Sequence, residues 1–195
     1  MTDAGIKELQ GLKHLHSLNL FATAITDAAT KDLAGLEGLQ SLGLGFTQLK
    51  GTGLKQLSGL KGLKSLDLSI TGVTDAELKD VAGLENLQSL FLYNTRVTDA
   101  GLKELSGLTN LRSLDLKTTS VSDAGMKELT GLTNLRSLEL GGDKPLTDAG
   151  IIELAGLKDL QSLNVRGTEV TDAGANQLRQ RLPKCTVLTT ANLDR

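Results

Sequence analysis

The chain has 195 residues and a formal net charge of −2, with 21 Lys and Arg residues against 23 Asp and Glu residues. This balance argues against nucleic acid as a partner, because phosphate binding requires a concentrated Lys/Arg surface. No apolar run approaches the roughly 18 residues of a membrane span, no signal peptide is visible, and a single cysteine, Cys185, excludes an internal disulfide framework. We therefore expect a cytoplasmic protein that binds neither membranes nor nucleic acid.

A Thr/Ser-Asp-Ala step recurs along the whole chain at a spacing of 24 residues, widened once to 25. The steps begin at Thr2, Thr26, Thr74, Thr98, Ser122, Thr147 and Thr171, and Lys50-Gly51-Thr52 occupies the same register. A fixed period of this length indicates a stack of similar units, each in contact with its neighbours. We expect one domain over residues 1–195, with seven full repeats that start at 2, 26, 50, 74, 98, 122 and 147 and a capping unit over 171–195.

Residues 98–121 illustrate the elements of one repeat. Thr98 suits a helix N-cap and Asp99 suits the first helical turn, and the apolar residues that follow recur at near-helical spacing until a glycine. This pattern predicts a helix of about two turns. Leu114 and Leu116 then alternate with polar residues, which predicts a short strand with one buried face. The equivalent strands are expected to centre near Leu18, Leu42, Leu66, Leu90, Leu114, Leu138 and Leu163.

Several residue types recur once per repeat and are expected to be structural. One leucine row is expected in the core, formed by Leu9, Leu33, Leu57, Val81, Leu105, Leu129, Leu154 and Leu178. A threonine row is expected to hydrogen-bond the turn backbone from one repeat to the next, formed by Thr23, Thr47, Thr71, Thr95, Thr119 and Thr168. The pattern departs from regularity at Thr30, at Lys50-Gly51, and at Asp143-Lys144-Pro145. Cys185 falls near a core leucine position and is expected to be a small buried hydrophobic residue.

The pattern LxxLxLxxTxV followed by TDAGLKELxGL resembles the leucine-rich repeat family. It is most similar to the bacterial class whose 24-residue repeats carry Thr where many members have Asn or Cys. The resemblance covers the whole chain. It implies an α/β fold, a right-handed solenoid (horseshoe) with a parallel sheet on the concave side and short helices on the convex side. It also implies a binding role, because family members usually recognise proteins through the concave face.

The residue types that usually carry catalysis or metal binding give no specific signal. His14 and His16 lie in one repeat without a partner cysteine, so a metal site is not expected, and His16 is expected to point to solvent on the concave side. The Asp and Ser rows recur in almost every repeat, whereas a catalytic Ser is singular and needs a base beside it. We therefore expect no enzyme activity and no cofactor.

In the pattern LxxLxLxxT, the second, third, fifth, seventh and eighth positions are expected to face outward from the concave sheet. All four aromatic residues of the chain occupy such positions, on repeats one to four, and the later repeats carry acids and bases there. An exposed aromatic cluster beside mixed charges suits a polypeptide ligand, although drift at positions free to vary would also produce it. The predicted ligand-binding residues are Phe21, Phe46, Ile70, Phe91, Tyr93, Asp67, Asp115, Lys117, Glu139, Arg112, Arg136 and Arg166.

The leading hypothesis is a non-catalytic protein–protein interaction module. Two alternatives remain open at the level of sequence: a substrate-recognition fragment of a larger enzyme, such as a ubiquitin ligase or a bacterial effector, and a scaffold with no selected ligand. The first strand, around Ser17 to Leu20, has no preceding repeat to pair with. Because an open strand edge invites pairing with another chain, we also expect weak self-association at the N-terminal edge.

Overall fold

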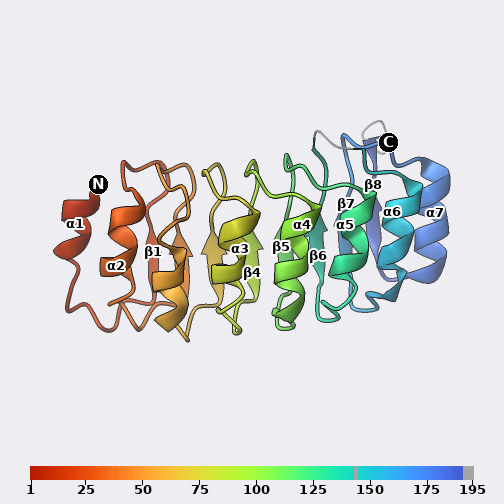
Figure 1. The fold of residues 1–195 in the computed structure, drawn as a ribbon. Coiled ribbons are helices and arrows are strands. Elements are labelled where there is room, and N and C mark those ends of the chain that lie inside the picture. The colour runs from red at the N-terminus through yellow and green to blue at the C-terminus, as the bar shows by residue number, and fades with distance from the viewer. Residues whose placement is uncertain (143–144, 191–195) are drawn as a thin grey trace.

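In the computed structural model, which describes residues 1–142 and 145–190, eight short parallel strands pair in chain order along one sheet (Figure 1). Each strand pairs in register with the equivalent residues of the next repeat, so that Leu18, Leu42 and Leu66 stand in one row. The strands are β1 (Ser17–Asn19), β2 (Ser41–Gly43), β3 (Ser65–Asp67), β4 (Ser89–Phe91), β5 (Ser113–Asp115), β6 (Ser137–Glu139), β7 (Ser162–Asn164) and β8 (Thr186–Leu188). The seven predicted strand positions are confirmed, and Thr186–Leu188 adds an eighth strand.

Short helices cover the other side of the sheet, one group per repeat (Figure 1). They are α1 (Asp3–Lys7), η1 (Asp27–Ala29), α2 (Thr30–Leu33), η2 (Leu54–Gly59), α3 (Asp75–Val81), α4 (Asp99–Leu102), η3 (Lys103–Gly107), α5 (Asp123–Met126), η4 (Lys127–Leu129), α6 (Asp148–Glu153), η5 (Leu154–Gly156) and α7 (Asp172–Arg181), where η denotes a 3-10 helix. The third repeat, which lacks the Thr-Asp start, has only the 3-10 helix η2. Of the departures that the sequence indicated, Asp143 and Lys144 lie outside the described residues.

The core lies between the sheet and the helices and is built almost entirely from leucine rows. From the second repeat onward these leucines are buried, including the whole strand row from Leu42 to Leu163. In the first repeat Leu9, Leu15 and Leu18 are only partly buried, because within residues 1–142 and 145–190 a neighbouring repeat packs on one side of them and not on the other. Leu9 therefore packs against the core as predicted, but it is not fully buried. Among the described residues, no helix is long and apolar enough to cross a membrane.

The threonine row closes the turn after each strand. Thr119 Oγ1 donates a hydrogen bond of 2.6 Å to the carbonyl oxygen of Leu116, three residues earlier in the same repeat. The same bond is made by Thr23, Thr47, Thr71, Thr95 and Thr168. The prediction of bonds from one repeat to the next is wrong, because the turn brings the repeat's own carbonyl within reach of the hydroxyl.

The connection between repeats on the helical side is instead made by the aspartate row. Asp99 accepts hydrogen bonds from Ser122 in the next repeat, from the backbone N–H at 2.7 Å and from Oγ at 2.6 Å. Ser122 Oγ also accepts a bond from the Ala124 N–H, two residues on, as the capping pattern predicted, and Thr26, Thr74, Thr98 and Thr147 make the same bond. Thr171 accepts from the Gly174 N–H instead, and Thr2 makes no cap bond. The equivalent Asp-to-Thr pairs are Asp3–Thr26, Asp75–Thr98, Asp123–Thr147 and Asp148–Thr171.

The glycine of the Thr-Asp-Ala-Gly step provides the space for this aspartate. A Cβ atom on Gly125 would clash with Asp99 Oδ1. At the third repeat Gly51 replaces the aspartate, and Glu77 stands where later repeats have this glycine. Glu77 Oε2 accepts from the N–H of Thr74 at 3.0 Å and from its Oγ1 at 2.6 Å. Thr74 is therefore also hydrogen-bonded to a carboxylate. This carboxylate belongs to the same repeat as Thr74, whereas in the other pairs it belongs to the preceding repeat.

Candidate functional site on the concave sheet face

The concave sheet face consists of the side chains that point away from the core on each strand and in the turn after it. Along most strands the central residue is buried and its two neighbours are half-buried, as the alternation predicted. Ten of the twelve predicted site residues lie at these outward positions, and Arg112 and Arg136 lie one residue before their strands. Phe21 and Phe46 are 49% and 56% exposed, which is high for aromatic side chains, and Tyr93 is also exposed. Ile70 and Phe91 are half-buried beside them.

The structure brings the predicted aromatic residues together in two groups. The rings of Phe21 and Phe46 pack at a centroid distance of 5.9 Å with an interplanar angle of 40°. Phe91 and Tyr93 lie on and just after β4, two repeats away from Phe46. Between these groups stands Ile70, whose backbone N–H donates to the carbonyl of Tyr93 at 2.7 Å. The apolar surface on repeats one to four thus has an aromatic pair at one end and a second aromatic group at the other.

In every full repeat but the sixth, the eighth position has a left-handed backbone, which the residue pattern did not predict. The φ angle is +52° at Phe46, +55° at Ile70 and +56° at Thr118, and it is also positive at Ala22, Asn94 and Gly167. This conformation is unfavourable for bulky and β-branched residues and costs about 1–3 kcal/mol there, whereas Gly adopts it freely. The signal in the sequence was the presence of Asn94 and Gly167 at this position, since both residue types favour positive φ.

The fifth position has a role in the turn that the sequence analysis also missed. Asp67 Oδ1 accepts a hydrogen bond of 2.8 Å from the backbone N–H of Ser69, two residues later. Asp115 bonds the N–H of Lys117 in the same way at 2.9 Å. The amide oxygens of Asn19 and Asn164 make the equivalent bonds to Phe21 and Arg166. One carboxylate oxygen of Asp67 and of Asp115 therefore has a structural function, and the other oxygen is not used by this turn.

Some of the charged side chains of the later repeats are paired with one another or hydrogen-bonded to a neighbouring side chain. Lys117 Nζ lies 3.9 Å from Glu139 Oε2, and Asn164 Nδ2 donates to the same oxygen at 2.7 Å. Burial raises the pKa of the Asp115 carboxyl, the hydrogen bond from the Lys117 N–H lowers it, and the charge of Glu139 raises it again. Arg112 and Arg136 are exposed at the second position, before their strands begin, and Arg166 is half-buried after β7.

A hollow of about 220 Å³ opens on the concave sheet face over the first three repeats. It exists because Gly43 stands in register between Asn19 and Asp67, so that the middle strand has no side chain at that place. Its lining residues are Ser17, Leu18, Asn19, Ser41, Leu42, Gly43, Ser65 and Asp67.

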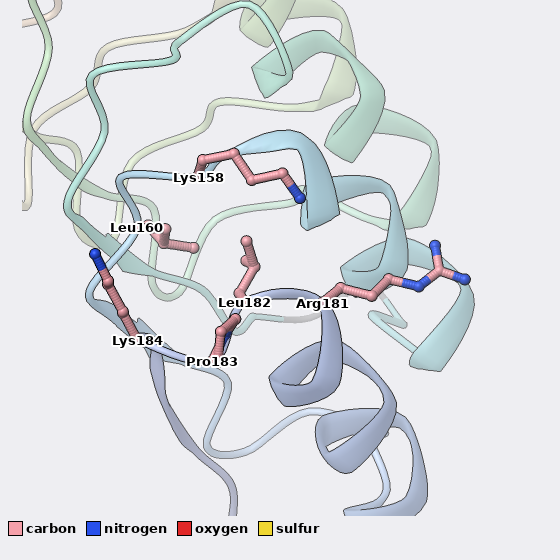
Figure 2. A pocket seen from close by; sticks show the side chains of 6 residues that line it. All are labelled: Lys158, Leu160, Arg181, Leu182, Pro183 and Lys184. Atoms are coloured by element: carbon pink, nitrogen blue, oxygen red, sulfur yellow. The ribbon is translucent and has the colours of Figure 1, made fainter.

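Other hollows lie away from this face. One of about 200 Å³ is formed near the C-terminal end, where Lys158 and Leu160 meet the segment after α7 (Figure 2). Its floor includes Leu160 and Leu182, which belong to the core, and the side chains of Arg181 and Lys184 extend in opposite directions from it (Figure 2). A larger groove of about 620 Å³ runs along the turns beside Gly51 and Glu77, where the third repeat lacks its aspartate.

The described residues do not bring together any group of three or more His, Cys, Asp or Glu side chains that could hold a metal ion. His16 is exposed, as the sequence predicted. Cys185 is buried, and burial raises the pKa of its thiol to about 11. The thiol is therefore protonated at neutral pH, which agrees with the predicted role as a small buried hydrophobic residue rather than a nucleophile.

Comparisons with known proteins agree with this architecture. Residues 85–125 match the family model for two copies of the leucine-rich repeat, and residues 157–177 match a model for a single such repeat. No curated protein sequence matches the chain significantly.

Solved structures show the same fold over nearly the whole chain. Internalin C2 from Listeria monocytogenes superposes with a TM-score of 0.72 and 26% identity, covering 97% of this chain and 75% of that one. A leucine-rich repeat protein of Leptospira interrogans gives a TM-score of 0.66 and 26% identity, covering 93% of this chain and 50% of that one. A plant peptide hormone receptor, at 20% identity and a TM-score of 0.63, shares the fold over 94% of this chain and 29% of its own. The protein is thus a solenoid with the leucine-rich repeat fold.

Proposed function

We propose that the protein is a non-catalytic interaction module that binds a polypeptide on its concave sheet face. The observation that carries this proposal is the presence of Phe46 and Ile70 at a left-handed backbone position. Gly167 occupies the equivalent position later in the chain without this conformational cost. Residues held in an unfavourable backbone conformation cluster at functional sites. Because glycine would fit this position without strain, we attribute the presence of these two side chains to contact with a ligand.

The chemistry of the face favours a polypeptide over other ligands. Aromatic side chains dominate the energetics of protein interfaces, and solenoids offer extended surfaces suited to long ligands. Half-burial of one aromatic ring contributes about 2–3 kcal/mol, whereas association costs about 4–15 kcal/mol. The apolar surface on repeats one to four is therefore expected to bind weakly by itself. Tight binding requires contacts with the charged residues of the later repeats, of which Lys117, Glu139 and Arg166 are examples.

The threonine turns also support assignment of the repeats to the bacterial 24-residue class. Thr95 and Thr119 are buried and close their turns with hydrogen bonds of 2.7 and 2.6 Å, so their hydroxyls have a fixed structural role. We also propose a cytoplasmic location, because the lone cysteine favours a reducing compartment.

Selection of random peptides displayed on phage against the immobilised protein tests the binding proposal. Peptides that are selected on the wild type are expected to lose affinity by tenfold or more for a Phe46→Ala/Tyr93→Ala double variant, because two exposed rings are removed. Lys103→Ala, an exposed change on the helical side, serves as the matched control and should leave the affinity unchanged. Equal affinity of the selected peptides for the wild type and the double variant would refute the proposal.

A further inference from the structure

The hollow over the first three repeats has the size of a single side chain. Its volume of about 220 Å³ is below the range of roughly 300–1,000 Å³ that holds cofactors and drug-sized ligands. Gly43 creates it between Asn19 and Asp67, and the hydroxyl-bearing residues Ser17 and Ser65 form part of its rim. The hollow can therefore receive one projecting group of a longer ligand that lies along the face.

A carboxylate and an aromatic ring meet beside this hollow. Asp67 Oδ2 and Phe21 Cδ2 lie 3.0 and 3.1 Å from the same point, the place that a Cβ atom on Gly45 would occupy. The two groups are thus at most about 6 Å apart, so that one cation bound to the carboxylate can also lie within the roughly 6 Å of a ring centroid over which a cation and a ring attract each other. Gly45 allows this approach because it has no side chain, and Phe46 extends the ring surface by its contact with Phe21.

The charged groups around Asp67 differ from those around Asp115, the aspartate at the same repeat position two repeats later. The Asp115 carboxyl lies close to both Lys117 and Glu139, and Lys117 is already paired with Glu139. No Lys, Arg or His within residues 1–142 and 145–190 lies at ion-pair distance from Asp67. The carboxylate of Asp67 therefore has no counter-charge at ion-pair distance among the described residues, and no neighbouring Lys117–Glu139 pair stands beside it as one does beside Asp115.

We propose that this hollow receives a basic side chain of the polypeptide ligand, which the Asp67 carboxylate binds at the side of the hollow that lies near the Phe21 ring. The proposal rests on the function proposed above and specifies the chemistry of one ligand residue. The planar guanidinium of arginine can donate to the Asp67 carboxylate while its face lies against Phe21, and the rim offers the Ser17 and Ser65 hydroxyls as further acceptors. An acidic ligand group is repelled by Asp67, and an apolar group leaves this carboxylate without a partner.

The first experiment uses a small probe and the intact protein. N-acetyl-arginine methylamide is titrated into the protein up to about 50 mM and followed by NMR, since one ion pair with a ring contact gives at most a millimolar affinity. The amide signals of Gly43, Gly45 and Ser69 are expected to shift. The citrulline analogue, which has nearly the same shape without the charge, should give much smaller shifts. Equal shifts with both compounds, or no shift with either, would overturn the inference.

Asp67→Asn is the decisive variant, and it is expected to fold. Asn19 and Asn164 already stand at the same repeat position and make the same turn hydrogen bond through their amide oxygens. The variant should reduce the response to the arginine probe by about tenfold, the value of a lost charge-assisted hydrogen bond. Asp115→Asn, the matched control, should respond like the wild type. An unchanged response in Asp67→Asn would show that the charge of Asp67 is not involved.

A display selection separates this inference from the function on which it rests. Peptides selected on the wild type should be enriched in Arg or Lys at one position, and selection on Asp67→Asn should lose this enrichment. If peptides bind the concave sheet face without any such enrichment, the function stands and the basic side chain is ruled out. If no peptide binds the face at all, the proposed function itself fails.

Discussion

Asp99 and Ser122 join two successive repeats through a pair of hydrogen bonds, from the Ser122 N–H at 2.7 Å and from its Oγ at 2.6 Å to the two oxygens of one carboxylate. The same pair recurs along the helical side of the solenoid, for example between Asp75 and Thr98. In a stack whose units touch only their neighbours, stability depends on such interfaces between repeats. The aspartate thus links adjacent repeats as well as standing at a helix start.

The first prediction concerns this link. Asp99→Asn should lower the free energy of unfolding by about 1–3 kcal/mol, because the amide nitrogen cannot accept the second hydrogen bond from Ser122. Urea denaturation measures the change. Asp159→Asn is the matched control at an exposed position and should change stability by about 0.5 kcal/mol or less. Equal midpoints for the two variants would show that the bonds between repeats contribute little.

The second prediction concerns the carboxylate that replaces the missing aspartate. Glu77→Ala should destabilise the protein by about 1–2 kcal/mol, because Thr74 loses the acceptor of both its N–H and its hydroxyl. Thermal unfolding compares this variant with Glu85→Ala, which changes an exposed glutamate. A loss of stability that is no greater for Glu77→Ala than for Glu85→Ala would contradict the role of Glu77.

The third prediction tests the strain at the eighth repeat position. Thr118 is exposed and β-branched, and its φ is +56°. Thr118→Asn should raise the free energy of unfolding by about 0.5–1 kcal/mol, since asparagine tolerates this conformation better. Thr109→Asn changes an exposed threonine without positive φ and should give no gain. A loss of stability in Thr118→Asn would mean that the left-handed position carries no strain to relieve.

The fourth prediction concerns the N-terminal end of the stack. Strand β1 is an edge strand that pairs with β2, and Leu12 and Met1 are 49% and 56% exposed there. We expect weak self-association through this end, because it offers both an open strand edge and apolar surface. Light scattering over a wide range of concentration should show a rising mean mass for the wild type and a constant mass for Leu12→Lys. A constant monomer mass for the wild type would refute the prediction.

The sequence predicted the regular part of the fold well because that part depends on local periodicity. The alternation around Leu114 and the 24-residue period determine which side chains are buried, and both can be read along the chain. The outward placement of Phe91 and Tyr93 follows from the same alternation.

Other features depend on the distances between atoms of adjacent repeats or on the conformation of a turn. They could not be predicted from the sequence for that reason. The bonds of Asp99 reach into the next repeat, and the packing of Phe21 against Phe46 requires the absence of a side chain at Gly45. The turn bond of Asp67 and the direction of the threonine bonds depend on the turn conformation. A pattern of residue types does not specify these distances.

The most direct test of the proposed function uses the four aromatic rings, because Phe21, Phe46, Phe91 and Tyr93 are the only aromatic residues of the chain and all lie on one face. The protein is labelled with ¹³C in Phe and Tyr, and NMR spectra are recorded while a selected peptide without aromatic residues is added. The ring signals are expected to shift and to saturate at the same peptide concentration as the binding curve. If the rings remain unchanged at saturation while amide signals of α3 and α4 shift, the ligand binds the helical side and the concave sheet face is not the binding site.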